Sequence, residues 1–162
     1  MGIPPQEPAA TSSDASATPP PDRPSRAAPE RFALSIKVQE ADIDQLGHVN
    51  NVVYLKWVQD VAVAHWRTVA TREQQAALIW VVIRHEIDYS SAARLGEDIV
   101  AETWVGMASR RTFERHTEIR RMPDRKLLAR ARTLWCPIDV GTGKPARVDA
   151  EVRARFSAAS TG

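Results

Sequence analysis

Residues 51–70 read NVVYLKWVQDVAVAHWRTVA, and residues 78–89 read LIWVVIRHEIDY; these two stretches decide the fold. In the first, apolar side chains recur every three or four residues, as at Val53, Trp57, Val61 and Ala64, which predicts a helix with a wide buried face. Asn50 or Asn51 is a suitable N-cap. The stretch is rich in valine, which lowers helix propensity, so we expect packing to hold this helix in the core.

In the second stretch the spacing of apolar residues changes to two, which predicts a half-buried strand. Its predicted apolar face contains Ile79, Val81, Ile83, Ile87 and Tyr89. The same pattern indicates further strands at residues 32–40, 98–109, 112–122 and 126–138, and residues 147–157 suit a short terminal helix. One strand, one long helix and four consecutive strands predict an α+β fold, with the helix packed against an antiparallel sheet.

The ends of this region are marked by composition. Eight of the 11 prolines lie in residues 1–30, together with much Ala and Ser, so we predict a disordered tail at 1–30 and a folded domain at 31–158. The single cysteine, Cys136, fits a reducing cytoplasm. No long apolar run predicts a membrane span. The net charge is only +2, and basic residues alternate with acidic ones, so nucleic acid is not an expected partner.

The residues with chemical potential gather just before the helix, in DIDQLGHVNN at residues 42–51. A helix N-terminus exposes unpaired N–H groups and partial positive charge, which can stabilise an oxyanion. A carboxylate nearby could act as a base or nucleophile, so this loop is compatible with acyl transfer. Asp and Asn also cap helices and form turns, so spacing alone leaves a purely structural role open.

This loop, followed by Val53-Tyr54-Leu55 and Trp57, resembles the signature of hotdog-fold thioesterases of the 4-hydroxybenzoyl-CoA thioesterase-like family. Its Gly-His-Val-Asn-Asn segment also resembles plant acyl-ACP thioesterases. The resemblance extends from residue 32 to about residue 140. It implies a long central helix wrapped by a five-stranded antiparallel sheet. It also implies a homodimer, able to pair again into a tetramer, with the acyl pocket between protomers.

The resemblance also implies roles for residues. Asp44 matches the catalytic carboxylate, and the backbone N–H of Asn51 matches the donor that polarises the thioester carbonyl. His48 matches a histidine of the plant enzymes, although this chain has Leu46 where those enzymes have asparagine. Arg110 and Arg111 are candidates for binding the CoA phosphates, because arginine suits phosphate. No cofactor or metal site is expected, since no suitable His, Cys and Asp spacing occurs.

The expected reaction is hydrolysis of an acyl-CoA, or of an acyl carrier protein thioester, to the free acid. One alternative is a hotdog hydratase or dehydratase. Its Asp-x-Asn-Pro-x-His loop matches poorly, because Asp44 and His48 are four positions apart and no proline intervenes. The other alternative is an acyl-binding hotdog protein without catalysis, against which Asp44 argues.

Overall fold

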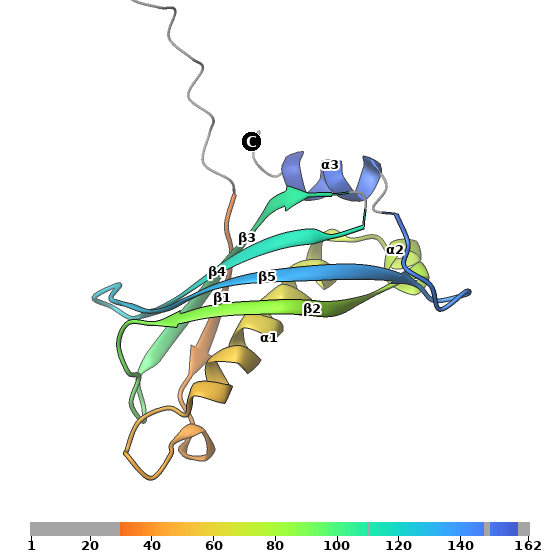
Figure 1. Ribbon diagram of the computed structural model, residues 1–162. Coiled ribbons are helices and arrows are strands. Elements are labelled where there is room, and N and C mark those ends of the chain that lie inside the picture. The colour runs from red at the N-terminus through yellow and green to blue at the C-terminus, as the bar shows by residue number, and fades with distance from the viewer. Residues whose placement is uncertain (1–29, 110, 148–149, 159–162) are drawn as a thin grey trace, which may run out of the picture.

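The sheet contains the five strands that the sequence predicts. In the computed structural model, which describes residues 30–109, 111–147 and 150–158, they are β1 (Phe32–Lys37), β2 (Leu78–Tyr89), β3 (Asp98–Ala108), β4 (Phe113–Arg121) and β5 (Leu127–Asp139). They lie in the order β1-β3-β4-β5-β2, and every neighbouring pair is antiparallel. The twisted sheet curves around one long helix (Figure 1).

That helix is α1 (Asn51–Val69), and its buried face fills the concave side of the sheet. Tyr54, Trp57, Val58 and Val61 are at most 2% exposed. They pack on small and branched side chains of the strands, including Ile99, Ala101, Ile119, Leu128 and Ala129. The predicted helix, its burial and the α+β hotdog arrangement are therefore confirmed.

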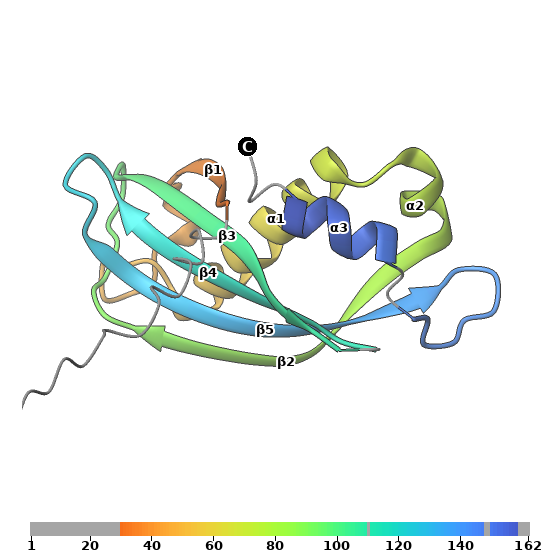
Figure 2. The same cartoon turned by 90° about the horizontal axis from the view of Figure 1, so that it is seen from above.

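A second apolar cluster lies at the C-terminal end of α1. There Ala62 packs with Phe113 and Trp135, and α3 (Ala150–Ala158) adds Val152 and Phe156. Figure 2 shows α3 beside this end of α1. The terminal helix was predicted. The six-residue α2 (Arg72–Ala77), capped by Thr71, was not.

The face assignment for the first half of β2 was wrong. Ile79, Val81 and Ile83 point away from α1 and are 55%, 46% and 57% exposed. Pairing with β5 shifts between Val82 and Arg84, so Ile83 is an extra residue, a β-bulge. Before the bulge the even-numbered residues face α1, and after it the odd-numbered ones do. This inversion breaks the period of two on which the prediction relied.

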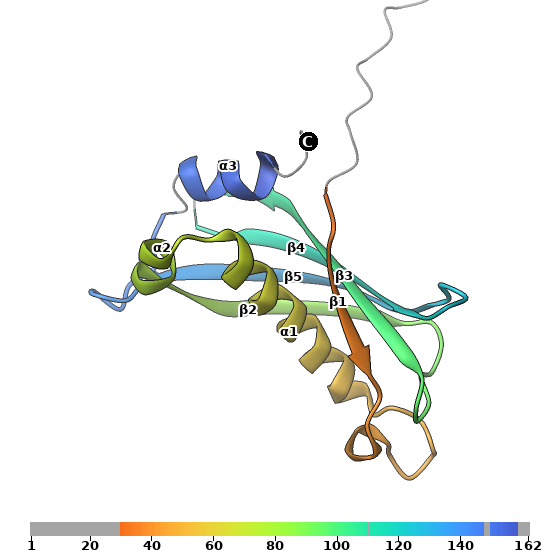
Figure 3. The same cartoon turned by 180° about the vertical axis from the view of Figure 1, so that it is seen from behind.

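The predicted tail, residues 1–30, lies outside the described residues except for Glu30. Within the described part of the chain, no helix has the length and apolar character needed to cross a membrane. At the opposite end of α1 from α3, the loop at residues 38–50 projects beyond the sheet (Figure 3).

Candidate functional site

The loop before α1 folds into a tight turn that holds Asp44 at its start. An isolated β-bridge joins Ile43 to Val49, and the Asp44 N–H donates to the His48 carbonyl at 2.8 Å. Gly47 takes a positive φ of 76°, which favours glycine, and its N–H donates to the Asp44 carbonyl at 3.0 Å. The Asp44 carboxylate accepts the Leu46 N–H at 2.8 Å. Three hydrogen bonds of the turn thus fix the Asp44 backbone and side chain.

The other carboxylate of the loop is committed to local structure. Asp42 ends the short 3₁₀ turn η1 (Glu40–Asp42), and its Oδ2 accepts the Gln39 N–H at 2.9 Å. Its carbonyl accepts the Asn50 N–H at 2.9 Å, which ties the turn to the start of the helix. These contacts agree with a structural role for Asp42.

Asn50 is the N-cap of α1, since its side chain accepts the Val52 N–H at 3.1 Å. Asn51 is therefore the first helical residue. Among the described residues, none accepts a hydrogen bond from the Asn51 N–H. A free N–H at the positive end of a 19-residue helix is suited to a developing oxyanion.

Two tyrosines connect this helix end to the loop after β2. The Tyr54 hydroxyl accepts the Ala93 N–H at 2.8 Å, and the Tyr89 hydroxyl donates to the Asn51 carbonyl at 3.1 Å. Their rings meet edge to face at 5.5 Å. Burial raises the pKa of both phenols, so both are neutral near pH 7. They position the helix end and the loop without adding charge.

These elements line an open cavity of about 430 Å³. It brings together Asp44, His48 and Asn51, as the resemblance implied. The remaining lining comes from Leu46, Val49, Asn50, Tyr54, Tyr89, Ser90, Ser91 and Ala92. The tyrosines and serines were not predicted as site residues. Tyr54 stands one helical turn after Asn51, so its position on the site-facing side could have been read from the sequence.

His48 is half-buried in this cavity. Within the described residues it is joined to Asp44 by the backbone bond of the turn, and no hydrogen bond connects the two side chains. The structure therefore gives His48 a place at the site without a side-chain bond to Asp44 among the described residues.

Other candidates lie elsewhere. Arg110 is outside the described residues, and Arg111 is exposed in the β3–β4 turn, whose Ser109 carbonyl accepts a bond from Arg153 of α3. That turn is at the other end of the sheet, so within one protomer Arg111 does not join Asp44. His85 of β2 is half-buried, and its Nδ1 lies 2.9 Å from the Thr133 hydroxyl. Among the described residues, no three His, Cys, Asp or Glu side chains gather as a metal site.

A carboxylate and, among the described residues, an unpaired helix N–H lie at one cavity, and the helix is wrapped by a five-stranded antiparallel sheet, which is the architecture of a hotdog fold. The model of the thioesterase-like superfamily matches residues 38–156, and the chain belongs to that family. The predicted family resemblance is confirmed.

Solved structures with this fold include thioesterases from several bacteria. The 1,4-dihydroxy-2-naphthoyl-CoA thioesterase of Synechocystis is 20% identical, with a TM-score of 0.68 over 78% of this chain and 96% of that one. The DHNA-CoA thioesterase of Staphylococcus aureus is 19% identical, with a TM-score of 0.71 over 81% of this chain and 91% of that one. A Thermus thermophilus thioesterase complexed with coenzyme A and zinc is 21% identical, with a TM-score of 0.70 over 80% of this chain and 94% of that one. No curated protein sequence matches the chain.

Proposed function

We propose that the protein hydrolyses an acyl-CoA thioester to a free acid and CoA, with Asp44 as the base or nucleophile. The observation that carries this proposal is the shared cavity of Asp44 and the free Asn51 N–H. The carboxylate would attack the thioester carbonyl or take a proton from the attacking water. The Asn51 N–H would stabilise the oxyanion, a contribution of about 2.7–4 kcal/mol in comparable sites.

The substrate carrier in this proposal is CoA. Structural relatives described as acyl-CoA thioesterases support that choice, and the S. aureus protein SAV2348, 12% identical with a TM-score of 0.74, was solved with CoA. An acyl carrier protein is the other carrier that we predict from the loop. Arg110 and Arg111 remain candidates for the CoA phosphates only if a second protomer brings their turn to the loop.

A homodimer is part of the proposal. Within the described part of the chain, the outer edge of β2 is unpaired along 12 residues, about 40 Å of strand, and Ile79, Val81 and Ile83 are exposed on this strand. Antiparallel pairing of two β2 edges around a two-fold axis would set the first half of one β2 beside the second half of the other. The second half of β2 ends at Tyr89, which lines the Asp44 cavity. The partner's β2 would therefore form a further wall of that cavity.

Thiol release measured over a panel of acyl-CoAs tests the reaction. We expect turnover of at least one acyl class and no hydration of enoyl-CoAs. Hydration without thiol release would favour a hydratase, and saturable acyl-CoA binding without either would favour an acyl-binding protein.

Light scattering and subunit mixing test the dimer. Mixing wild-type chains with Asp44→Asn chains should give heterodimers with about one working site each, because each site uses one catalytic loop. A fully active monomer at the assay concentration would refute the arrangement.

A further inference from the structure

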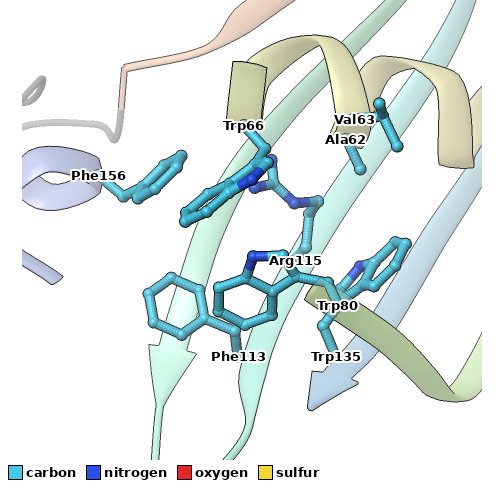
Figure 4. Close-up of a pocket in the computed structure, with 8 residues that line it drawn as sticks. All are labelled: Ala62, Val63, Trp66, Trp80, Phe113, Arg115, Trp135 and Phe156. Carbon is cyan, nitrogen blue, oxygen red and sulfur yellow. The ribbon is translucent and has the colours of Figure 1, made fainter. Parts of the chain in front are cut away.

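A second cavity, of about 60 Å³, lies at the other end of α1 from Asp44. Five aromatic side chains enclose it, together with Ala62, Val63 and one charged residue, Arg115. Figure 4 shows the Arg115 side chain extending from β4 toward α1 among the rings of Trp66, Trp80, Phe113, Trp135 and Phe156. A single cation in such an aromatic wall is unusual for a structural core.

Arg115 is only 7% exposed, yet no carboxylate among the described residues pairs with it. Its Nη1 lies 2.9 Å from His65 Nδ1 and donates to the Thr103 hydroxyl at 3.3 Å. His65 brings no compensating charge, since burial and the neighbouring guanidinium lower the pKa of His65 to about 3. Burial lowers the pKa of Arg115 only to about 10, so a buried positive charge remains at neutral pH. Such a charge is costly unless an anion joins it.

The free part of the guanidinium has the right shape for an anion. Within the described part of the chain, Nε and Nη2 of Arg115 make no hydrogen bond. These two nitrogens present parallel N–H groups, the fork that binds both oxygens of a carboxylate.

Two indole N–H groups of the cavity wall are also unused, although they are closed off from its open space. The indole nitrogens of Trp80 and Trp135 are buried, and neither has a hydrogen-bond partner among the described residues. Buried indole N–H groups normally find an acceptor. Arg115 and the two indoles of the wall therefore carry unpaired donors within the described part of the chain.

We propose that this cavity binds the carboxylate end of an apolar acyl group, with Arg115 as its counter-ion. The aromatic walls suit a short hydrocarbon body. A water needs roughly 10–15 Å³ measured in the same way, so the space admits a carboxylate and a few carbon atoms. A polyphosphate is a poor fit, because only one cation lines the wall.

The acyl assignment rests on the proposed thioesterase function and on the dimer. Within one protomer the cavity is about 20 Å along α1 from Asn51, judged from Trp66 in its wall. In the proposed dimer, the first half of β2 carries Trp80 to the Asp44 cavity of the partner. A thioester held at one protomer's Asp44 would then extend its acyl end toward Arg115 of the partner subunit. The substrate class is therefore the CoA thioester of an acid that carries a second carboxylate.

Binding of free acids tests the cavity without any turnover. Propionate and butyrate are compared with propionamide and butyramide by calorimetry and by tryptophan fluorescence, because three tryptophans line the space. The carboxylates should bind at least about 10-fold more tightly than the amides. Equal binding of acid and amide, or no binding of either in the millimolar range, would overturn the proposal.

Variants locate the binding. Arg115→Met should reduce acid affinity to that of the amide, and Arg132→Met, on the opposite face where Arg132 pairs with Glu114 and Glu86, should leave it unchanged. If Arg115→Met does not fold, Arg115→Lys takes its place. The comparison of acid with amide binding by the wild-type protein still tests whether the cavity recognises a carboxylate. Undiminished acid binding by a folded Arg115→Met variant would overturn the assignment to this cavity.

Thioesters then test the acyl assignment. The kcat/KM for the CoA thioester of a dicarboxylic acid should exceed that of the monocarboxylic thioester of equal length, and Arg115→Met should abolish this preference. Acid binding without any hydrolysis would reject the thioesterase function and with it the acyl role. Hydrolysis that ignores the second carboxylate would reject the acyl role while the thioesterase function stands.

Discussion

Asp44→Asn is the sharpest test of the site, because the structure supplies a matched control in the same loop. The asparagine oxygen can still accept the Leu46 N–H, so the turn at Gly47 should persist. What is lost is the charge on one hydrogen bond, about 1 kcal/mol of stability. Asp42→Asn makes the same chemical change, and its oxygen can still accept the Gln39 N–H.

The two variants should differ in rate far more than in stability. Asp44 lines the cavity and Asp42 does not. Loss of a positioned base or nucleophile should reduce hydrolysis at least about 100-fold, which corresponds to about 2.7 kcal/mol in the transition state. Asp42→Asn should be much milder.

Thiol release at saturating and limiting substrate gives kcat and kcat/KM for both variants, with circular dichroism and thermal melts as controls for folding. Normal turnover by a well-folded Asp44→Asn protein would refute the mechanism. Equal losses in the two variants would show that the wrong carboxylate was assigned.

Three further predictions concern stability. Tyr54→Phe leaves the buried Ala93 N–H without its acceptor and should cost about 1–3 kcal/mol in urea unfolding; an unchanged midpoint would contradict this. A chain that starts at Pro29 should keep its activity and melting temperature, whereas a drop of several degrees would show that the tail docks. Burial raises the pKa of Glu118, but hydrogen bonds from three arginines outweigh it and hold that pKa at about 2, below the ordinary 4.5. The resulting stability is present above about pH 5 and lost as pH falls toward 2, and Glu118→Gln should flatten this part of the acid-unfolding curve.

The helix and the strands could be predicted because their side-chain periods are local. The steps of three and four residues in α1 and the alternation in β5, with Arg130 outward and Ala129 and Ala131 buried, follow directly from backbone geometry. The polar loop before the helix could also be predicted from the sequence. In the structure its residues Asp44, His48 and Asn51 lie around one cavity.

Features that depend on pairing between distant segments could not be predicted. The bulge at Ile83 depends on the register of β2 with β5, so residues 78–89 alone do not predict it. Arg115 lies in an alternating strand rich in charge, so its sequence environment indicates solvent exposure. Only the sheet register shows that it faces α1, opposite Thr133. The relation of Arg111 to the Asp44 loop likewise depends on how two protomers pair.

The bulge at Ile83 shapes both the aromatic cavity around Arg115 and the outer edge of β2. Without an extra residue, a strand that placed His85 and Ile87 under α1 would also place Ile79, Val81 and Ile83 there, and Trp80 would face outward. The bulge instead turns Trp80 and Val82 inward, where Trp80 closes the aromatic cavity beside Trp66. It also turns three apolar side chains outward along the unpaired edge. One inserted residue therefore builds the cavity around Arg115 and, on the same strand, leaves the hydrophobic edge on which the proposed dimer depends.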